Sequence, residues 1–180
     1  MVLILCLSLT LLTACETQAP TSVLAAEVYT DPQGLFSIAY PEGWRYSHDP
    51  EADLVTFSPI EQEDTQNPLA VMVYAVPTAA TTVDASGEEA KALLEEFLKQ
   101  NLDESYQVYS SGDTTVDHQA AAVIDFGKPI EGGYASGRIV LIYSPGYAVG
   151  FLGSAQQETW EEFLPTFRTM LAEFHFSPVE

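Results

Sequence analysis

Short stretches in which apolar and polar residues alternate predict β-strands in the first half of the chain after residue 26. In one of them Phe36, Ile38 and Tyr40 occupy every second position, so these three side chains share one face. The segment 69–76 is apolar on both faces, as expected of a central strand. The strands predicted in this half are 27–31, 35–40, 53–58 and 69–76, and Pro- and Gly-containing turns at 31–34 and 41–44 follow the first two.

Two later segments repeat apolar residues at the period of an α-helix. The first begins at Ser86, a common N-cap residue, and is expected to end near residues 101–103. The second runs from 156 to 172, and we expect Pro165 to kink or split it because proline removes one backbone hydrogen bond. The apolar faces comprise Ala90, Leu93, Leu94, Phe97 and Leu98 in the first helix, and Trp160, Phe163, Leu164, Phe167, Met170, Leu171 and Phe174 in the second.

Four strands are predicted between the helices, at 106–115, 119–126, 136–143 and 147–153, and a short extended piece at 174–176 ends the chain. Tight connections at 117–118 and 144–146 force the strands that they join to be antiparallel. The fold class that follows is α+β: an antiparallel β-sheet flanked by two main helices that cover its apolar faces.

The chain begins with an apolar run, Val2 to Leu12, which is shorter than the about 20 residues of a transmembrane helix and fits a signal peptide. The run ends in Leu12-Thr13-Ala14-Cys15, which resembles the lipobox of bacterial lipoproteins, although no Lys or Arg precedes the run. The resemblance implies that a diacylglycerol is attached to Cys15 and that the chain is cleaved before it. The alternative is a buried N-terminal strand or helix that ends in a cysteine.

The lipoprotein interpretation divides the chain into a signal peptide (1–14), a lipidated Cys15 with a flexible tether (15–26), and one domain (27–180). The mature protein is then held on the extracytoplasmic face of a cell membrane, in the periplasm or at the cell surface. Cys6 lies in the segment to be removed, so neither a disulfide nor a cysteine-based metal site is expected.

The formal net charge of −20, with only six Lys and Arg residues, argues against nucleic acid as a partner, because phosphate backbones are bound by clusters of basic residues. The same charge opposes contact of the domain with anionic lipid headgroups. We therefore expect the lipid to be the membrane contact and a membrane protein to be the partner.

No residue set has the pattern of a catalytic centre. The segments Ser110-Ser111-Gly112 and Ser144-Pro145-Gly146 place serine close to glycine, but neither has the form of a Gly-x-Ser-x-Gly nucleophile elbow. The histidines are far apart in sequence and lack the close spacing of a zinc-binding helix. We read His48 and His118 as turn residues and His175 as a sheet-edge residue, and we expect no enzymatic activity.

Two acidic segments carry alternative interpretations. The first is a solvated loop or a weak Ca²⁺, Mn²⁺ or Zn²⁺ site, although it lacks the glycine and the distal Glu of a calcium loop; no other cofactor is predicted. Its candidate ligands are His48, Asp49, Glu51 and Asp53. The second, in a Pro-bounded loop, supplies either solubility charges or a partner contact, and its acidic residues are Glu61, Glu63 and Asp64.

The segment from Gly34 to Trp44 resembles the opening of the PsbP-like family, which has the form F-x-I-x-Y-P-x-G-W after a Gly-containing turn. The order of the elements that follow is also similar to that family, and it implies an α/β/α sandwich. The residues of the motif are structural: apolar side chains on one strand face, a turn, and a tryptophan that closes the sheet edge. They are Phe36, Tyr40, Pro41, Gly43 and Trp44.

The resemblance also implies a functional class. The best-known members of the family are extrinsic subunits on the lumenal side of photosystem II, and bacterial relatives are often lipoproteins. We therefore expect a non-catalytic accessory or assembly module for a membrane protein complex. The alternative is a lipoprotein that binds a small ligand or a divalent metal, which includes a calcium-related photosystem II role in a photosynthetic host. No metal-binding residue set of the family maps onto this chain.

Overall fold

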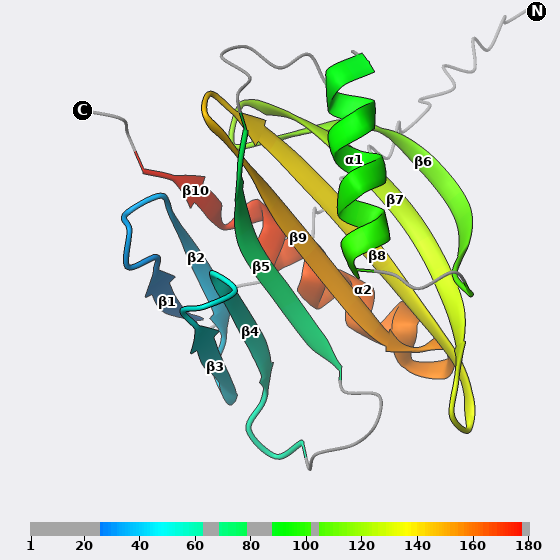
Figure 1. Cartoon of the computed structure of the whole chain (residues 1–180). Coiled ribbons are helices and arrows are strands. Elements are labelled where there is room, and N and C mark those ends of the chain that lie inside the picture. Colours follow the sequence, from blue (N-terminus) through cyan, green and yellow to red (C-terminus); the bar gives the residue numbers. More distant parts are fainter. Residues whose placement is uncertain (1–25, 63–68, 79–87, 102–104, 178–180) are drawn as a thin grey trace, which may run out of the picture.

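The computed structural model describes residues 26–62, 69–78, 88–101 and 105–177 (Figure 1). In chain order the elements are β1 (Ala26–Thr30), β2 (Phe36–Pro41), β3 (Trp44–Asp49), β4 (Leu54–Pro59), β5 (Ala70–Pro77), α1 (Glu88–Asn101), β6 (Gln107–Val116), β7 (Gln119–Ile130), β8 (Gly133–Ser144), β9 (Tyr147–Gln156), α2 (Gln157–Ala172) and β10 (Phe174–Phe176). Cys15 and the predicted signal peptide and tether up to residue 25 lie outside these residues, and so does the predicted N-cap Ser86.

The strands form two antiparallel sheets. A seven-stranded sheet has the order β3-β4-β5-β9-β8-β7-β6, and a three-stranded sheet has the order β1-β2-β10. The α+β class and the antiparallel pairing are confirmed. A single sheet was predicted, whereas the last strand β10 pairs with β2 and so builds the smaller sheet from the two ends of the domain.

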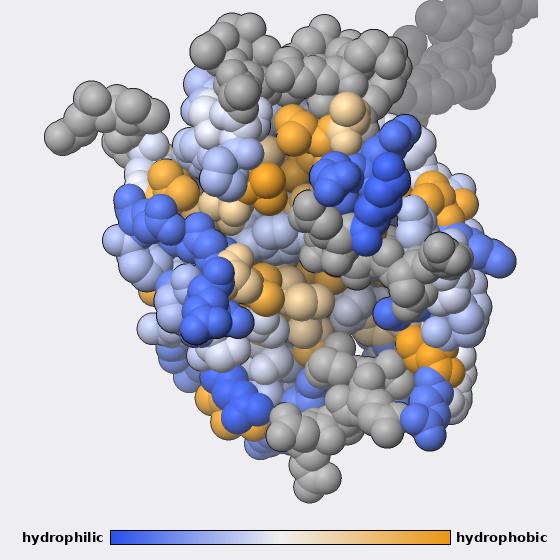
Figure 2. Space-filling model, in the orientation of Figure 1, coloured by the Kyte–Doolittle hydropathy of each residue, from blue (hydrophilic) through white to orange (hydrophobic). Residues whose placement is uncertain are grey.

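The large sheet is the middle layer of a sandwich (Figure 1). Helix α1 covers one face, where Phe97 and Leu98 pack against side chains of β7, β8 and β9. Helix α2 and the small sheet share the other face, where Phe163 and Phe167 of α2 belong to the same core cluster as Ile38 of β2. The α/β/α arrangement is therefore present, with one outer layer made partly of β-structure. On the α1 side, Figure 2 shows apolar side chains near the middle of the face and hydrophilic ones around them.

Helix α2 is continuous from Gln157 to Ala172, so the expectation that Pro165 splits it was wrong. The side chains on both sides of the proline, Leu164 and Phe167 among them, are buried against the sheet and hold the two turns in one helix. The exposed side of α2 carries Pro165 itself, and the Thr169 hydroxyl donates a hydrogen bond to its carbonyl oxygen (2.9 Å).

Strand β3 was not predicted, because Trp44 and Tyr46 are its only two apolar residues and most of its side chains are exposed. It exists through its pairing with β4, from Trp44 opposite Pro59 to Asp49 opposite Leu54. His48 is therefore a strand residue, and its assignment to a turn was wrong. The hairpins of the second half are longer than expected, since β7 continues to Ile130 and β8 already begins at Gly133.

Candidate functional site

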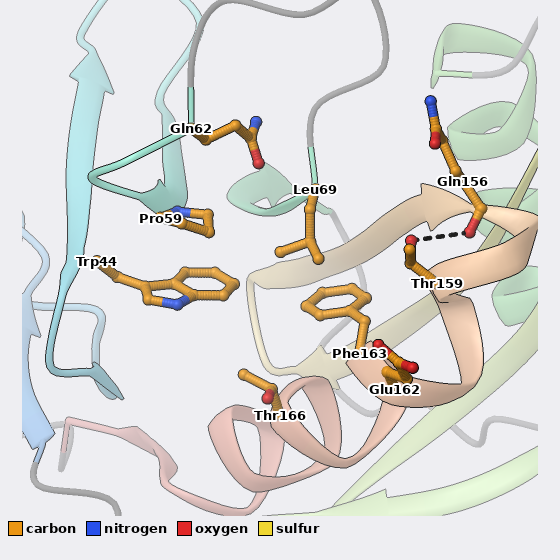
Figure 3. Close-up of a pocket in the computed structure, with 9 residues that line it drawn as sticks. All are labelled: Trp44, Pro59, Gln62, Leu69, Gln156, Thr159, Glu162, Phe163 and Thr166. Atoms are coloured by element: carbon orange, nitrogen blue, oxygen red, sulfur yellow. Dashed lines mark hydrogen bonds between the residues drawn. The ribbon is translucent and has the colours of Figure 1, made fainter. Parts of the chain in front are cut away.

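An open cavity of about 500 Å³ lies between the edge of the large sheet and the first half of α2 (Figure 3). Strands β3 and β4 form one wall, α2 forms the opposite wall, and the start of β5 closes one side. The lining residues are Trp44, Pro59, Gln62, Leu69, Gln156, Thr159, Glu162, Phe163 and Thr166. We call this space the Trp44 cavity.

Two parallel aromatic rings form the centre of the Trp44 cavity. The ring centroids of Trp44 and Phe163 lie 6.2 Å apart with an angle of 14° between the planes. Trp44 has this position because it follows a tight turn in which Gly43 has φ +80°, and the Gly43 carbonyl accepts a hydrogen bond from the Ile60 amide (2.8 Å). Phe163 is held from its other side by Trp160, edge to face at 5.7 Å. Trp44 does lie on an edge strand, but the sequence did not predict that it lines a cavity.

The Trp44 cavity is lined by polar as well as apolar side chains. Among its described lining residues Glu162 is the one charged side chain, and no Ser, Cys or His is present. Thr159 donates a hydrogen bond from its hydroxyl to the Gln156 carbonyl oxygen (3.2 Å), so this hydroxyl is bound to the backbone of the first turn of α2 (Figure 3). A concave site that combines aromatic and aliphatic side chains with several polar groups can bind a ligand or a side chain of a partner.

The four metal-ligand candidates are not brought together. His48 Nε2 lies 3.9 Å from Asp53 Oδ1, but Asp53 also accepts a hydrogen bond from Gln33 Nε2 (2.9 Å). Asp49 closes its own turn, because its Oδ1 accepts hydrogen bonds from the amides of Glu51 and the next residue. Over the described parts of the chain, no three His, Cys, Asp or Glu side chains form a group that could hold a metal ion.

Of the three acidic residues considered as a partner contact, Glu61 is exposed and precedes Gln62, which lines the Trp44 cavity. Glu63 and Asp64 lie outside the described residues. Neither described helix is long and apolar enough to cross a membrane.

His118 and His175 have the positions expected of them. His118 lies in the tight β6–β7 turn with φ +65°, and His175 lies in β10 at the edge of the small sheet. Asp117 joins the two elements: its carboxylate accepts a hydrogen bond from the Phe176 amide (2.8 Å) and lies 3.3 Å from His175 Nδ1. The Phe176 amide, followed by the His175 side chain, holds the pKa of Asp117 below its ordinary value even though burial opposes this.

Comparison with known proteins supports the fold through structure alone. No protein-family model and no curated protein sequence matches the chain. The solution structure of cyanobacterial PsbP (CyanoP) from Synechocystis is similar with a TM-score of 0.65 at 15% identity, over 88% of this chain and 96% of that one. LpqN, described as involved in cell envelope biogenesis of Mycobacterium tuberculosis, is similar with a TM-score of 0.60 at 12% identity, over 87% of this chain and 88% of LpqN.

A third similar structure is the Ran-binding protein Mog1p of Saccharomyces cerevisiae, with a TM-score of 0.53 at 10% identity, over 84% of this chain and 95% of Mog1p. At these identities the likeness concerns the fold and no individual residue role. It agrees with the Gly34 to Trp44 motif, whose turn and tryptophan shape the edge of the large sheet. This chain has the PsbP fold.

Proposed function

We propose that this protein is a lipid-anchored accessory subunit on the extracytoplasmic face of a cell membrane, where it binds a membrane protein complex without catalysing a reaction. Its anchor is Cys15, and its contact with the partner is the Trp44 cavity together with Glu61 beside it. The lipid keeps the domain close to its partner, while the charge of −20 keeps the domain off anionic headgroups.

The Trp44 cavity is the observation that carries this proposal. It is open to solvent and presents the half-buried ring of Trp44, backed by the buried ring of Phe163, with one carboxylate and several uncharged polar groups, which is a set suited to recognition. Two proteins with this fold are described by a partner or a process, namely Ran binding for Mog1p and cell envelope biogenesis for LpqN. A binding role for the fold agrees with these descriptions.

The acidic residues at the Trp44 cavity indicate the charge that the partner surface should carry. Glu162 lies in the cavity wall and Glu61 lies beside it, and no Lys or Arg is among the described lining residues. We therefore expect the partner to insert an apolar or aromatic side chain between basic residues, because opposite charges steer association and fix its orientation.

Site-specific photocrosslinking in cells tests this contact. A photoreactive residue replaces Glu162 in the cavity wall or, as the matched control, Glu95 on the exposed side of α1 on the opposite face. Both positions are exposed glutamates on helices, so neither replacement should disturb folding. We expect one membrane-protein adduct from position 162 and none from position 95. Equal adducts from both positions, or no adduct from 162, would contradict the proposed contact.

The anchor needs its own test. Cys15→Ala should move the protein from the membrane to the soluble fraction and should abolish incorporation of an alkyne-labelled fatty acid. It should also remove the adduct from position 162, because the domain then loses its high local concentration at the membrane. A Cys15→Ala protein that stays on the membrane would refute lipid anchoring, whatever the crosslinking shows.

A small-molecule site is the second candidate function, because the volume of the Trp44 cavity, about 500 Å³, lies within the range of ligand pockets. Native mass spectrometry of protein isolated from its own cells would show a bound mass. That mass should disappear in Thr166→Trp, which fills the cavity. A spectrum of the bare chain alone would leave the partner contact as the function of the cavity.

A further inference from the structure

We propose that a second cleft, between strand β6 and helix α2, binds a small organic monocarboxylate through the guanidinium group of Arg168. This site is separate from the Trp44 cavity and does not depend on the proposed partner contact.

The cleft exists because the large sheet is wider than the layer that covers it. Helix α2 packs on β8 and β9, and the sheet continues past it to β7 and β6. The space left beside the helix has a volume of about 330 Å³ and an apolar floor formed by the half-buried Val123 and Leu171, with the buried Val140 and Phe167 beneath them. Gly112 of β6 stands opposite Val123 and adds no side chain to the space.

The polar rim of the cleft is a row across three strands. Ser110 pairs with Asp125, and Asp125 pairs with Arg138, so the three side chains lie side by side on one sheet face. Arg138 donates two hydrogen bonds to the two carboxylate oxygens of Asp125, at 2.6 and 2.9 Å. Ser110 donates a third from its hydroxyl, at 2.7 Å. This arrangement fixes Asp125 as an ionised, fully engaged group.

Arg168 of α2 is the positive group left over. It lines the cleft, and within the described part of the chain it forms no hydrogen bond or ion pair. Its charge nevertheless acts at the rim: burial of Asp125 raises the pKa of its carboxyl, but Arg138, Ser110 and Arg168 together bring that pKa below the ordinary value. Two guanidinium groups and one carboxylate leave one positive charge uncompensated in the cleft.

The uncompensated positive charge indicates which class of ligand the cleft would bind. One carboxylate would neutralise the cleft, and its planar oxygens match the fork of a guanidinium. A dianion would leave an excess negative charge in a domain that already carries −20. The hydroxyl of Thr114, which shares the sheet face of Val123 and Asp125, can donate a further hydrogen bond to the carboxylate, and the floor can cover a short alkyl or aromatic body.

Nuclear magnetic resonance with matched pairs of probes tests the site. Butyrate, hexanoate and benzoate are each titrated against their primary amides, which have the same shape without the charge. We expect the carboxylates to shift the Arg168 Nε–Hε signal and the methyl signals of Val123, Val140 and Leu171 in a saturable way at millimolar concentration. If no carboxylate does so, or if the amides bind as well, the proposal is wrong.

Two variants sharpen the result. Arg168→Gln should weaken carboxylate binding by about tenfold or more, while Arg45→Gln on the distant strand β3 should leave it unchanged. Asp125→Asn adds one positive charge to the balance and should allow succinate to bind, which the native protein should reject. Arg168 and Arg45 are both exposed, so neither substitution should disturb folding. Melting temperatures equal to that of the native protein would establish this. If Arg168→Gln and Arg45→Gln weaken binding equally, the effect is due to the overall charge of the protein, and the proposed site is wrong.

Discussion

The ring of Phe97 on helix α1 occupies the space in which a side chain at Gly150 of strand β9 would stand. Three residues later, on the opposite face of the same strand, the ring of Phe167 on helix α2 lies in the same way against Gly153. Successive residues of a strand face opposite sides of a sheet, so the odd spacing gives each helix its own glycine. Strand β9 thereby brings both helices close to the middle layer.

We expect Gly150→Ala to lower the free energy of unfolding by about 1–3 kcal/mol, because the new methyl group overlaps Phe97 and a packed core accommodates added volume poorly. Urea denaturation measures the change. Gly112→Ala is the control, since its Cβ would stand 4.0 Å from a methyl carbon of Val123. The double variant Gly150→Ala, Phe97→Leu should recover part of the loss. Equal stability of the two alanine variants would show that the close approach of Phe97 has no energetic weight.

Replacement of Pro165 should stabilise the protein. Pro165→Ala restores a backbone hydrogen bond within α2, and removal of a proline from a helix interior is worth up to about 3 kcal/mol. A gain of flexibility in the unfolded chain offsets about 0.4–1 kcal/mol of this. We therefore expect a net increase of about 1–2 kcal/mol in thermal or urea unfolding. Pro32→Ala, in an exposed turn that suits proline, should instead lower stability slightly. A lower melting temperature of Pro165→Ala would contradict the argument.

The sequence predicted most of the fold because its signals are local. Apolar alternation located β2, a run that is apolar on both faces located β5, the helical period located the buried face of α2, and tight turns implied antiparallel hairpins. Strand β3 was not predicted, because most of its residues are exposed and the strand depends on its pairing with β4. The separate small sheet was not predicted, because the pairing of β10 with β2 joins segments from opposite ends of the domain.

The candidate sites were much less predictable. Trp44 was recognised as part of a turn motif, but the partner that gives it a cavity, Phe163, follows more than a hundred residues later in the sequence. Arg138 and Arg168 are far apart in the sequence, and only strand register and helix placement bring them to one cleft. The acidic segment around His48 was a more obvious candidate, because its carboxylates are close together in the sequence. Proximity in the sequence does not ensure that carboxylates converge in the fold, and in the described residues these do not form a metal-binding group.

Stability at acid pH should depend on Asp117. The pKa of this carboxyl in the folded protein lies below its ordinary value of 3.8, chiefly through the Phe176 amide, so its ionised form stabilises the fold at neutral pH. That contribution disappears as the pH falls through the folded pKa. Asp117→Asn retains an acceptor oxygen and suits the φ of +45°, so it removes mainly the charge.

We expect Asp117→Asn to cost about 1 kcal/mol at neutral pH and to match the native protein once Asp117 is protonated. Urea denaturation along a pH series measures the difference. Asp113→Asn, on the exposed strand β6, should cost little at any pH. A deficit of Asp117→Asn that persists unchanged at the acid end would assign the effect to shape and would exclude the charge.

Tyr29 should limit stability at alkaline pH. Its side chain is 5% exposed, and among the described residues its hydroxyl has no hydrogen-bond partner. Burial, followed by the charges of Asp31, Tyr46 and Asp53, raises the pKa of Tyr29 from 10.0 to about 12. The unfolded chain therefore ionises first, and the folded state loses stability as the pH rises from 10.0 towards about 12.

Tyr29→Phe removes an unsatisfied hydroxyl from the space between the two sheets while its ring keeps the edge-to-face contacts with Tyr46 and Phe57. We expect the variant to be as stable as the native protein at neutral pH or up to about 1 kcal/mol more stable, because a buried hydroxyl without a partner opposes folding. Its advantage should grow in the alkaline range, since it has no proton to lose. Thermal unfolding at neutral and alkaline pH tests both statements, with Tyr46→Phe, at a 49% exposed position, as the control. A Tyr29→Phe protein that is clearly less stable at neutral pH would show that the hydroxyl is satisfied, by water or by a partner, and would remove the reason for its alkaline effect.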